Sequence, residues 1–232
     1  MANRIHPTAI IGDGVEVGDD NVIGPYAVIV GPTRIGNGNW IAPHAVIGTP
    51  AEYRTGPHPV AWDGELSGAG VSVGDSNIIR EFVTINQGTH DTTRLGSGCY
   101  ILARSHIGHD CVVDDAVTLS DAVQIGGHSR VWSWANIGMG AIVHQRCDVG
   151  PGAMVGMASA VRKPAEPFMI TVGNPARAVG INRVGLARLG CSDELVDEYE
   201  RSVKAKAGLP SGLPEAVGSQ LAAWSSSISD KE

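Results

Sequence analysis

Residues 107–148 read IGHDCV VDDAVT LSDAVQ IGGHSR VWSWAN IGMGAI VHQRCD, and every group of six begins with a long or branched aliphatic residue. The same period runs through most of the 232-residue chain. The aliphatic positions fall in three runs: Ile5, Ile11, Val17, Ile23, Ile29, Ile35, Ile41 and Ile47; Val73, Ile79 and Ile85; and Leu95, Ile101, Ile107, Val113, Leu119, Ile125, Val131, Ile137, Val143, Val149, Val155 and Val161. Hexapeptide repeats of this kind are typical of a parallel β-helix.

Two further regularities describe the repeat. Glycine often follows the aliphatic residue, and the fifth position of the group is usually small, as in Ala45, Cys111 and Ala141. This period matches neither the roughly 3.6-residue turn of an α-helix nor the alternation of a conventional strand. It fits a short extended segment followed by a glycine-assisted corner. Three such segments would close a triangular coil of about 18 residues, with the aliphatic side chains inside.

The frame divides the chain into two regions. Residues 1–170 are predicted to form the β-helix, with excursion loops at 49–72 and 86–94, where the frame breaks. Residues 171–232 are predicted to form a connecting segment and carboxy-terminal helices. Ser192 is a good helix cap followed by acidic residues, so a helix is expected from there up to Gly208. A second helix is expected over residues 214–224.

Composition narrows the class of partner and the compartment. The formal net charge is −7, which argues against a nucleic-acid partner of the basic-patch type. No apolar run is long enough to span a membrane, and a cytoplasmic location is expected. Three of the four cysteines, Cys99, Cys111 and Cys147, occupy the small fifth position, so we interpret them as packing residues.

Residues about 18 apart should stack on neighbouring coils, so one ridge of the predicted prism can be written down. One column holds His109, Gly127, Gln145 and Lys163. The column one residue earlier includes His144 and Arg162, and the column one residue later includes Asp110, His128 and Arg146. His106 lies just before this strip. Imidazole titrates near neutral pH and suits proton transfer. The strip therefore predicts an acid–base site; the alternative is a polar outer surface without chemistry.

Four motifs in these coils resemble the UDP-N-acetylglucosamine O-acyltransferase family, the hexapeptide-repeat acyltransferases of lipid A biosynthesis. They are SNIIREFVTINQGT (76–89), SHIGHDCVV (105–113), GGHSRV (126–131) and VHQRCDVG (143–150). The resemblance implies an all-β, left-handed parallel β-helix that forms a homotrimer. It also implies transfer of an acyl group from an acyl carrier protein or coenzyme A thioester to a hydroxyl of a sugar nucleotide like UDP-N-acetylglucosamine. No cofactor beyond that co-substrate, and no metal, is expected.

The resemblance also assigns roles to single residues. His109 would be the general base, Asp110 its acidic partner, and Gly127 the source of a backbone N–H for the oxyanion. Positions that match substrate-contacting residues are His106, His128, His144, Gln145, Asn182 and Arg188. Met157 falls where the family sets acyl-chain length, and its bulk favours a medium chain. The basic residues Arg146, Arg162 and Lys163 would bind an anionic acyl donor, with a solvated charged face as the alternative.

The chain departs from that family near the expected acceptor site. The stretch AEYRTG (51–56) replaces a Gln-Asp-x-Lys-Tyr type motif, with Glu52 and Arg54 as candidate substitutes. Val184 stands where the family has Glu, and Leu189 stands where it has a second Arg. These differences leave open the acceptor, the acyl-chain length, the donor, and O- against N-acylation.

Three other functions are weighed against this one. A coenzyme A-dependent acyltransferase would act on a different hydroxyl- or amino-bearing sugar nucleotide or small metabolite. A zinc enzyme similar to the γ-type carbonic anhydrases would need three converging histidines, usually with a pair five residues apart, and this sequence has no such pair. A non-catalytic scaffold would have no reason to line one ridge with histidines.

Overall fold

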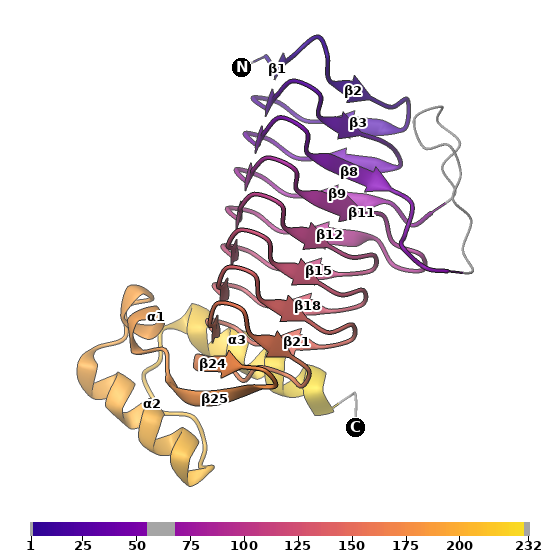
Figure 1. Ribbon diagram of the computed structural model, residues 1–232. Coiled ribbons are helices and arrows are strands. Elements are labelled where there is room, and N and C mark those ends of the chain that lie inside the picture. Colours follow the sequence, from indigo (N-terminus) through magenta and orange to yellow (C-terminus); the bar gives the residue numbers. More distant parts are fainter. Residues whose placement is uncertain (1, 55–67, 230–232) are drawn as a thin grey trace.

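The computed structural model describes residues 2–54 and 68–229. Three parallel sheets wrap around one axis and form a prism, with the amino terminus at one end and three helices at the other (Figure 1). The expected fold class, a parallel β-helix with a small carboxy-terminal helical region, is confirmed.

Each side of the prism is one sheet of short strands. Sheet A contains β1 (Arg4–Ile5), β4 (Val22–Ile23), β7 (Trp40–Ile41), β10 (Ile78–Ile79), β13 (Tyr100–Ile101), β16 (Thr118–Leu119), β19 (Asn136–Ile137), β22 (Met154–Val155), β24 (Met169–Gly173) and β25 (Ala176–Ile181). Sheet B contains β2 (Ile10–Ile11), β5 (Val28–Ile29), β8 (Val46–Thr49), β11 (Thr84–Asn86), β14 (His106–Ile107), β17 (Gln124–Ile125), β20 (Ile142–Val143) and β23 (Ala160–Val161). Sheet C contains β3 (Val15–Val17), β6 (Thr33–Ile35), β9 (Val71–Val73), β12 (Thr93–Leu95), β15 (Val112–Val113), β18 (Arg130–Val131) and β21 (Asp148–Val149).

The strands of each sheet stack in the register that the hexads predict. Ile107 pairs with Ile125, and the same spacing of 18 residues recurs over most of the prism. The interruption at 86–94 lengthens one coil, so that Thr84 pairs with His106, 22 residues further on. The other predicted excursion, 49–72, begins at the last residue of β8 and runs into β9, so its bounds overlap both strands. Its residues 55–67 lie outside the described residues.

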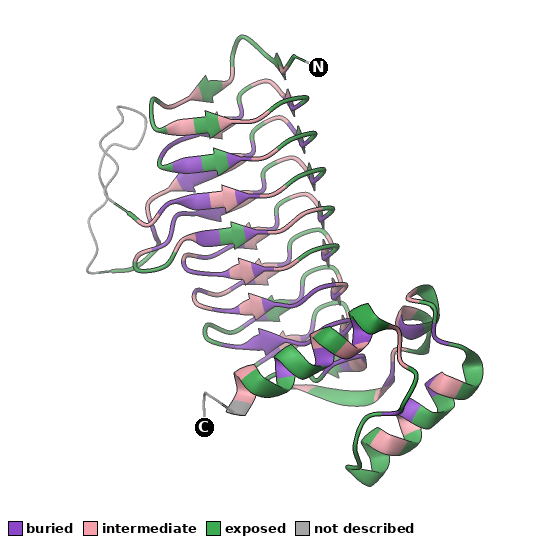
Figure 2. Ribbon diagram, turned by 180° about the vertical axis from the view of Figure 1, so that it is seen from behind, coloured by how far each residue is buried: buried purple, intermediate pink, exposed green. Residues whose placement is uncertain are grey.

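From Ile23 to Val161 the aliphatic residues of the hexads are buried and form one continuous core along the prism, whereas the first coil is largely exposed (Figure 2). The glycines that follow these aliphatic residues were predicted to form the corners, but the structure gives them another role. A Cβ on Gly108 would lie 2.9 Å from the backbone nitrogen of Gly127 on the next coil, so glycine is needed for close approach between coils. The left-handed residue of that corner comes two positions later, at Asp110, whose φ is 57°. The corner is therefore made by a non-glycine residue.

The carboxy-terminal region closes the last coil. β24 pairs in parallel with β22, and β25 folds back on it as an antiparallel strand, a hairpin that the hexad pattern does not predict. The helices are α1 (Arg183–Arg188), α2 (Asp193–Ala205) and α3 (Glu215–Ser229). α1 is unexpected, α2 matches its prediction, and α3 extends beyond the expected end at residue 224. Their buried side chains gather around Phe168 and Leu186, and in the described ranges no helix is long and apolar enough to cross a bilayer.

A ladder of buried asparagines ties the first coils together at the corner between sheets C and A. The Asn39 amide donates to Oδ1 of Asn21 at 3.1 Å and to the carbonyl of Gly74 at 2.9 Å. Its Oδ1 accepts from the backbone and side-chain nitrogens of Asn77 at 2.9 and 3.0 Å. Asn21, Asn39 and Asn77 are each at most 1% exposed. Buried amides are tolerated here because nearly every donor and acceptor finds a partner one coil away.

We predict that Asn39→Ala lowers the free energy of unfolding by about 2–4 kcal/mol, because its ladder neighbours would keep unpaired polar groups away from water. The matched control is Asn37→Ala, in an exposed ladder where Asn37 bonds to Asp75 at 3.1 Å and water can replace the lost contact. That loss should stay below about 1 kcal/mol. Chemical denaturation followed by circular dichroism measures both, and equal stability of the two variants would contradict the role of the ladder.

Candidate active site

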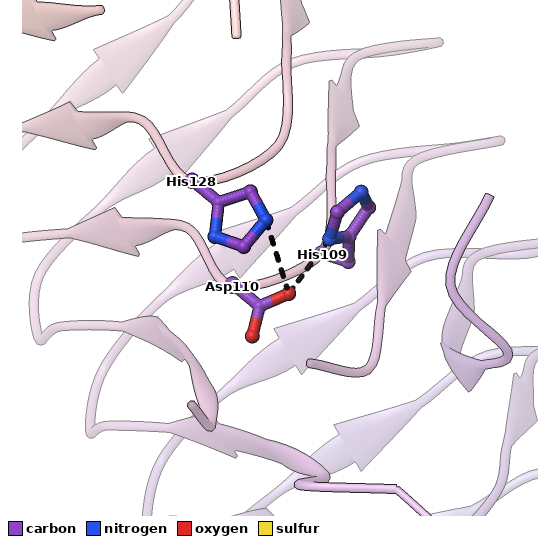
Figure 3. Close-up of side chains that lie close together, drawn as sticks. All are labelled: His109, Asp110 and His128. Atoms are coloured by element: carbon purple, nitrogen blue, oxygen red, sulfur yellow. Dashed lines mark hydrogen bonds and ion pairs between the residues drawn. The ribbon is translucent and has the colours of Figure 1, made fainter. Parts of the chain in front are cut away.

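The predicted strip of polar residues lies at the corner between sheets B and C. His109 and Asp110 follow β14 and precede β15. Adjacent residues in a strand point to opposite faces, but the left-handed conformation of Asp110 brings both side chains together. Nδ1 of His109 lies 2.7 Å from Oδ2 of Asp110 (Figure 3). Because an ionised carboxylate only accepts hydrogen bonds, the imidazole proton belongs on Nδ1 and Nε2 is the free base.

The Asp110 carboxylate is held by the loop between β11 and β12. The N–H groups of His90 and Asp91 each donate to Oδ1 at 2.8 Å. Thr89 donates its N–H to both oxygens at 3.0 Å and its hydroxyl to Oδ2 at 2.8 Å. Burial alone would raise the pKa of Asp110, but the hydrogen bonds from His109 and from this loop outweigh it and hold the pKa well below the usual range. His109 therefore has an ionised partner at any working pH.

His128 stacks one coil further on and faces the same carboxylate. Its N–H donates to the carbonyl of His109 at 2.9 Å, and its Nε2 lies 3.9 Å from Oδ2 of Asp110. The two imidazole rings stand edge to face with centroids 4.9 Å apart, and Figure 3 shows both pointing toward one oxygen. Burial lowers the pKa of His128 more than Asp110 raises it, and Arg146 adds to the lowering. His128 is therefore favoured as a neutral imidazole.

Gly127 lies directly against the ring of His109. A Cβ at this position would be 2.7 Å from Nε2 and 2.9 Å from Cε1, closer than real contacts allow. Because glycine has no Cβ, it is the residue that lets the His109 imidazole occupy this position. Among the described residues, the N–H of Gly127 has no hydrogen-bond acceptor. A free backbone donor beside the basic nitrogen is suited to stabilising a developing oxyanion.

A groove of about 280 Å³ opens beside these groups. Its lining residues are Glu52, His106, Gly108, His109, Gln124, Ile125, Gly126, Gly127, Ile142, Val143 and Gln145. Nδ1 of His106 pairs with the Thr84 hydroxyl at 2.8 Å, and its Nε2 lies 3.7 Å from the Glu52 carboxylate. Burial lowers the pKa of His106 although Glu52 opposes this. The groove therefore combines the imidazoles of His106 and His109, the Glu52 carboxylate and an apolar wall.

The other residues of the strip continue along the same corner. His144, Gln145 and Arg146 follow on the next coil and Arg162 and Lys163 on the one after, all of them exposed. Nδ1 of His144 is 3.0 Å from the carbonyl of Gln145. The side of the groove nearest the carboxy-terminal end is therefore open and cationic.

Met157 is 70% exposed, so it does not serve as ordinary core packing. Ile142, which lines the groove, is 54% exposed. These two apolar side chains are thus more than half exposed on the outer surface of the coils.

Asn182 and Arg188 occupy a different part of the molecule. Asn182 caps α1, accepting from the N–H of Gly185 at 3.0 Å, and its amide donates to the carbonyl of Gly152 at 2.9 Å. Gly152 belongs to the corner between sheets C and A, not to the corner of His109. Arg188 lies exposed in α1, as does Val184, and Leu189 ends that helix. None of the four lines the groove in the part of the chain that the structure describes.

One set of residues has the spacing of a metal site. His109, Asp110 and His128 each offer a ligand atom, and the three atoms lie within 4.8 Å of one another. The carboxylate already accepts hydrogen bonds on both oxygens, from His109 and from the loop that carries Thr89. Hydrogen bonding therefore accounts for the geometry of this cluster.

Cys111 follows Asp110 directly but is no nucleophile. It is buried, and its thiol donates to the carbonyl of Gly126 at 3.2 Å. Burial raises the pKa of this thiol to about 12. The interpretation of Cys111 as a packing residue agrees with this environment.

The loop between β11 and β12 is the part of the site that sequence reasoning misses. The interruption at 86–94 carries no catalytic motif of its own, yet Thr89, His90 and Asp91 supply most of the donors to Asp110. The position of the interruption could have indicated this role, because the hexad frame breaks one coil before the His109–Asp110 pair. Tyr53 is a second omission, with its ring centroid 6.2 Å from that of His109.

Comparison with known proteins gives sequence relatives for this chain. No protein-family model matches it. The acyl-[acyl-carrier-protein]–UDP-N-acetylglucosamine O-acyltransferases of Thiobacillus denitrificans and Herminiimonas arsenicoxydans are each 41% identical, over 137 and 157 residues. These matches cover 58% and 66% of this chain. The chain spans 53% and 59% of the length of these curated relatives.

Solved structures with the same architecture cover more of the chain. UDP-N-acetylglucosamine O-acyltransferase from Moraxella catarrhalis superposes with a TM-score of 0.73 and 29% identity, covering 98% of this chain and 92% of that one. The UDP-N-acetylglucosamine acyltransferase from Campylobacter jejuni gives a TM-score of 0.77 and 27% identity, with 94% of each chain covered. By sequence and by fold, the chain is similar to the UDP-N-acetylglucosamine O-acyltransferases.

Proposed function

We propose that this protein transfers an acyl group from an acyl carrier protein thioester to a hydroxyl of UDP-N-acetylglucosamine or a closely similar sugar nucleotide. One observation carries the proposal: the imidazole of His109 is held at Nδ1 by a buried carboxylate and presents Nε2 beside Gly127 in a groove. The relatives and solved structures described above carry this activity in their names. In lipid A biosynthesis, which the motifs imply, this would be the first acyl transfer.

The proposed mechanism moves one proton and exchanges one bond. Nε2 of His109 takes the proton of the acceptor hydroxyl while the hydroxyl oxygen attacks the thioester carbonyl carbon. The new C–O bond pushes the carbonyl electrons onto oxygen, where the N–H of Gly127 stabilises the charge. Collapse of this intermediate breaks the C–S bond, and protonated His109 returns the proton to the departing thiolate. Asp110 stays ionised and stabilises the imidazolium, and no resident cofactor or metal takes part.

The donor is proposed to approach from the cationic end of the corner. Arg146, Arg162 and Lys163 are exposed there and suit the phosphate of a phosphopantetheine arm. The acyl chain would lie along the apolar outer residues of the same coils, which include Ile142 and Met157. A medium-length chain is expected, since Met157 would shorten the path.

The acceptor is proposed to bind over His106, His128, His144 and Gln145, with Glu52 on the opposite wall of the groove. Asn182 caps α1 and bonds to Gly152 at another corner of the same chain, and Arg188 is exposed in α1. They would contact this acceptor only if they came from a neighbouring copy. The four buried cysteine thiols fit a reducing cytoplasm, where we place the enzyme.

A homotrimer would supply that neighbouring copy, and the surface offers a suitable contact. Sheet A exposes an outward row of apolar residues, and the corner between sheets A and B carries three stacked rings with centroids 5.3 and 5.0 Å apart. The row is Trp40, Ile78 and Tyr100, and the stack is Tyr26, His44 and Phe82. Exposed apolar patches of this kind mark protein interfaces, and closed cyclic symmetry would use the same patch in each copy.

We predict that His109→Ala folds normally but loses activity by about 10²–10⁴-fold, because it lacks the proton acceptor. The assay follows product by mass spectrometry with acyl carrier protein and coenzyme A donors and a panel of acceptors that includes UDP-N-acetylglucosamine. His6→Ala, an exposed histidine in the first coil, is the control and should match the wild type. A His109→Ala enzyme of near-wild-type rate would refute the mechanism, and a preference for another acceptor would refute the substrate.

We predict that Gly127→Ala lowers kcat by about 10²-fold or more, because the new Cβ displaces the His109 ring and crowds the oxyanion donor. Gly180→Ala is the matched control, since a Cβ at Gly180 meets nothing within 4 Å. Steady-state kinetics on both variants test the arrangement. Full activity in Gly127→Ala would show that reacting atoms do not occupy this place.

We predict that Phe82→Glu dissociates the trimer, because it puts a charge into the stacked rings of the proposed interface. Ser72→Glu on the outward side of sheet C is the control and should remain trimeric. Light scattering coupled to size-exclusion chromatography measures both masses. A wild-type monomer with full activity would overturn the assembly.

A further inference from the structure

The coil before the catalytic corner is longer than its neighbours for a reason visible in its contacts. Its extra residues form the loop between β11 and β12, and this loop packs against Asp110 instead of projecting into solvent. A Cβ on Gly88 would overlap the carbonyl oxygen of Asp91, so the turn can close only with glycine there. The insertion thus builds a cradle of donors around one carboxylate.

Within this cradle, one side chain meets the oxygen that His109 uses. The backbone N–H groups of His90 and Asp91 donate to Oδ1. The Thr89 hydroxyl instead donates to Oδ2 at 2.8 Å, and Nδ1 of His109 reaches the same atom at 2.7 Å. The backbone N–H of Thr89 lies between the two oxygens, 3.0 Å from each. Of the loop's four donor groups, the Thr89 hydroxyl is the one that a substitution can remove without changing a backbone N–H.

We propose that Thr89 is a positioning residue, whose hydroxyl fixes the Asp110 carboxylate and limits how strongly Oδ2 holds the proton of the His109 imidazole. Its effect on rate rests on the proposed function, whereas its effect on the hydrogen bond does not. The donors on one carboxylate oxygen share its electron density, so loss of the Thr89 hydroxyl strengthens the hydrogen bond from His109. Thr89 therefore keeps the His109 imidazole oriented, and it prevents Asp110 from stabilising the imidazolium so strongly that proton return to the thiolate becomes slow.

Removing the hydroxyl should have two consequences. In Thr89→Val the hydrogen bond between His109 and Asp110 shortens, and the downfield proton resonance of this imidazole N–H moves further downfield. The acid limb of the kcat/KM profile moves to higher pH by about 0.5, and kcat falls about two- to tenfold because the carboxylate is less firmly oriented. Thr89→Ser keeps the hydroxyl and should restore both properties.

The experiment compares these variants with Thr92→Val, which is matched in loop and in chemistry. The Thr92 hydroxyl donates to the carbonyl of Ala69 at 2.8 Å and makes no contact with Asp110. Proton NMR of the ligand-free protein records the resonance, assigned by its loss in His109→Ala, and steady-state kinetics record the pH profile. Circular dichroism verifies that each variant is folded.

The outcomes separate the two proposals. An unmoved resonance and an unchanged profile in Thr89→Val would overturn the role of Thr89. Equal effects in Thr92→Val would also overturn it, because they would indicate general loosening of the loop. A shifted resonance in Thr89→Val, with no acyl transfer by any form of the protein, would support the role of Thr89 while refuting the proposed reaction.

Discussion

The hydrogen-bonded stacking of one coil on the next is the constraint on which the whole site depends. The N–H of His128 donates to the carbonyl of His109 at 2.9 Å, and the N–H of Arg146 donates to that of Gly127 at 3.0 Å. These bonds fix the rise between coils at the strand spacing of about 4.8 Å. A slip of one residue would send the aliphatic side chains outward and the imidazoles inward. Burial of the core therefore also enforces the alignment of the catalytic corner.

The corners, more than the flat sides, give this fold its chemistry. A left-handed residue at Asp110 and another at His128 turn polar side chains toward each other, which an extended strand would not do. The cost of burying the Asp110 carboxylate is offset by donors from His109 and from the enlarged coil that contains Thr89 and Asp91. A regular coil does not supply such a cluster of donors, since most of its backbone N–H groups bond to carbonyls of neighbouring coils. Irregularity in the repeat is thus part of the site.

The regular features could be predicted from the sequence because period fixes position. The hexads gave the sheets and the register, and residues 18 apart, such as Asp110 and His128, do meet. Other contacts were missed because no period describes them. The path of the 86–94 interruption depends on where Asp110 needs partners, and the β24–β25 hairpin depends on how the last coil is closed. The asparagine ladder that includes Asn39 occupies the small fifth position, where pairing between coils replaces apolar packing.

The contrast between regular coils and irregular segments also bears on which acceptor the proposed reaction would use. His109, Asp110 and Gly127 lie in or beside regular coils, where a substitution disturbs the ladder or the close approach of backbones. Glu52 lies on an excursion and Val184 in α1, where side chains are exposed and the backbone is not tied to the register. Under the proposed function, changes at these irregular positions would alter which molecule binds without moving Nε2 of His109 or the N–H of Gly127. The departures from the family pattern fall at such positions, so they bear on the choice of acceptor and not on the residues that the proposed acyl transfer uses.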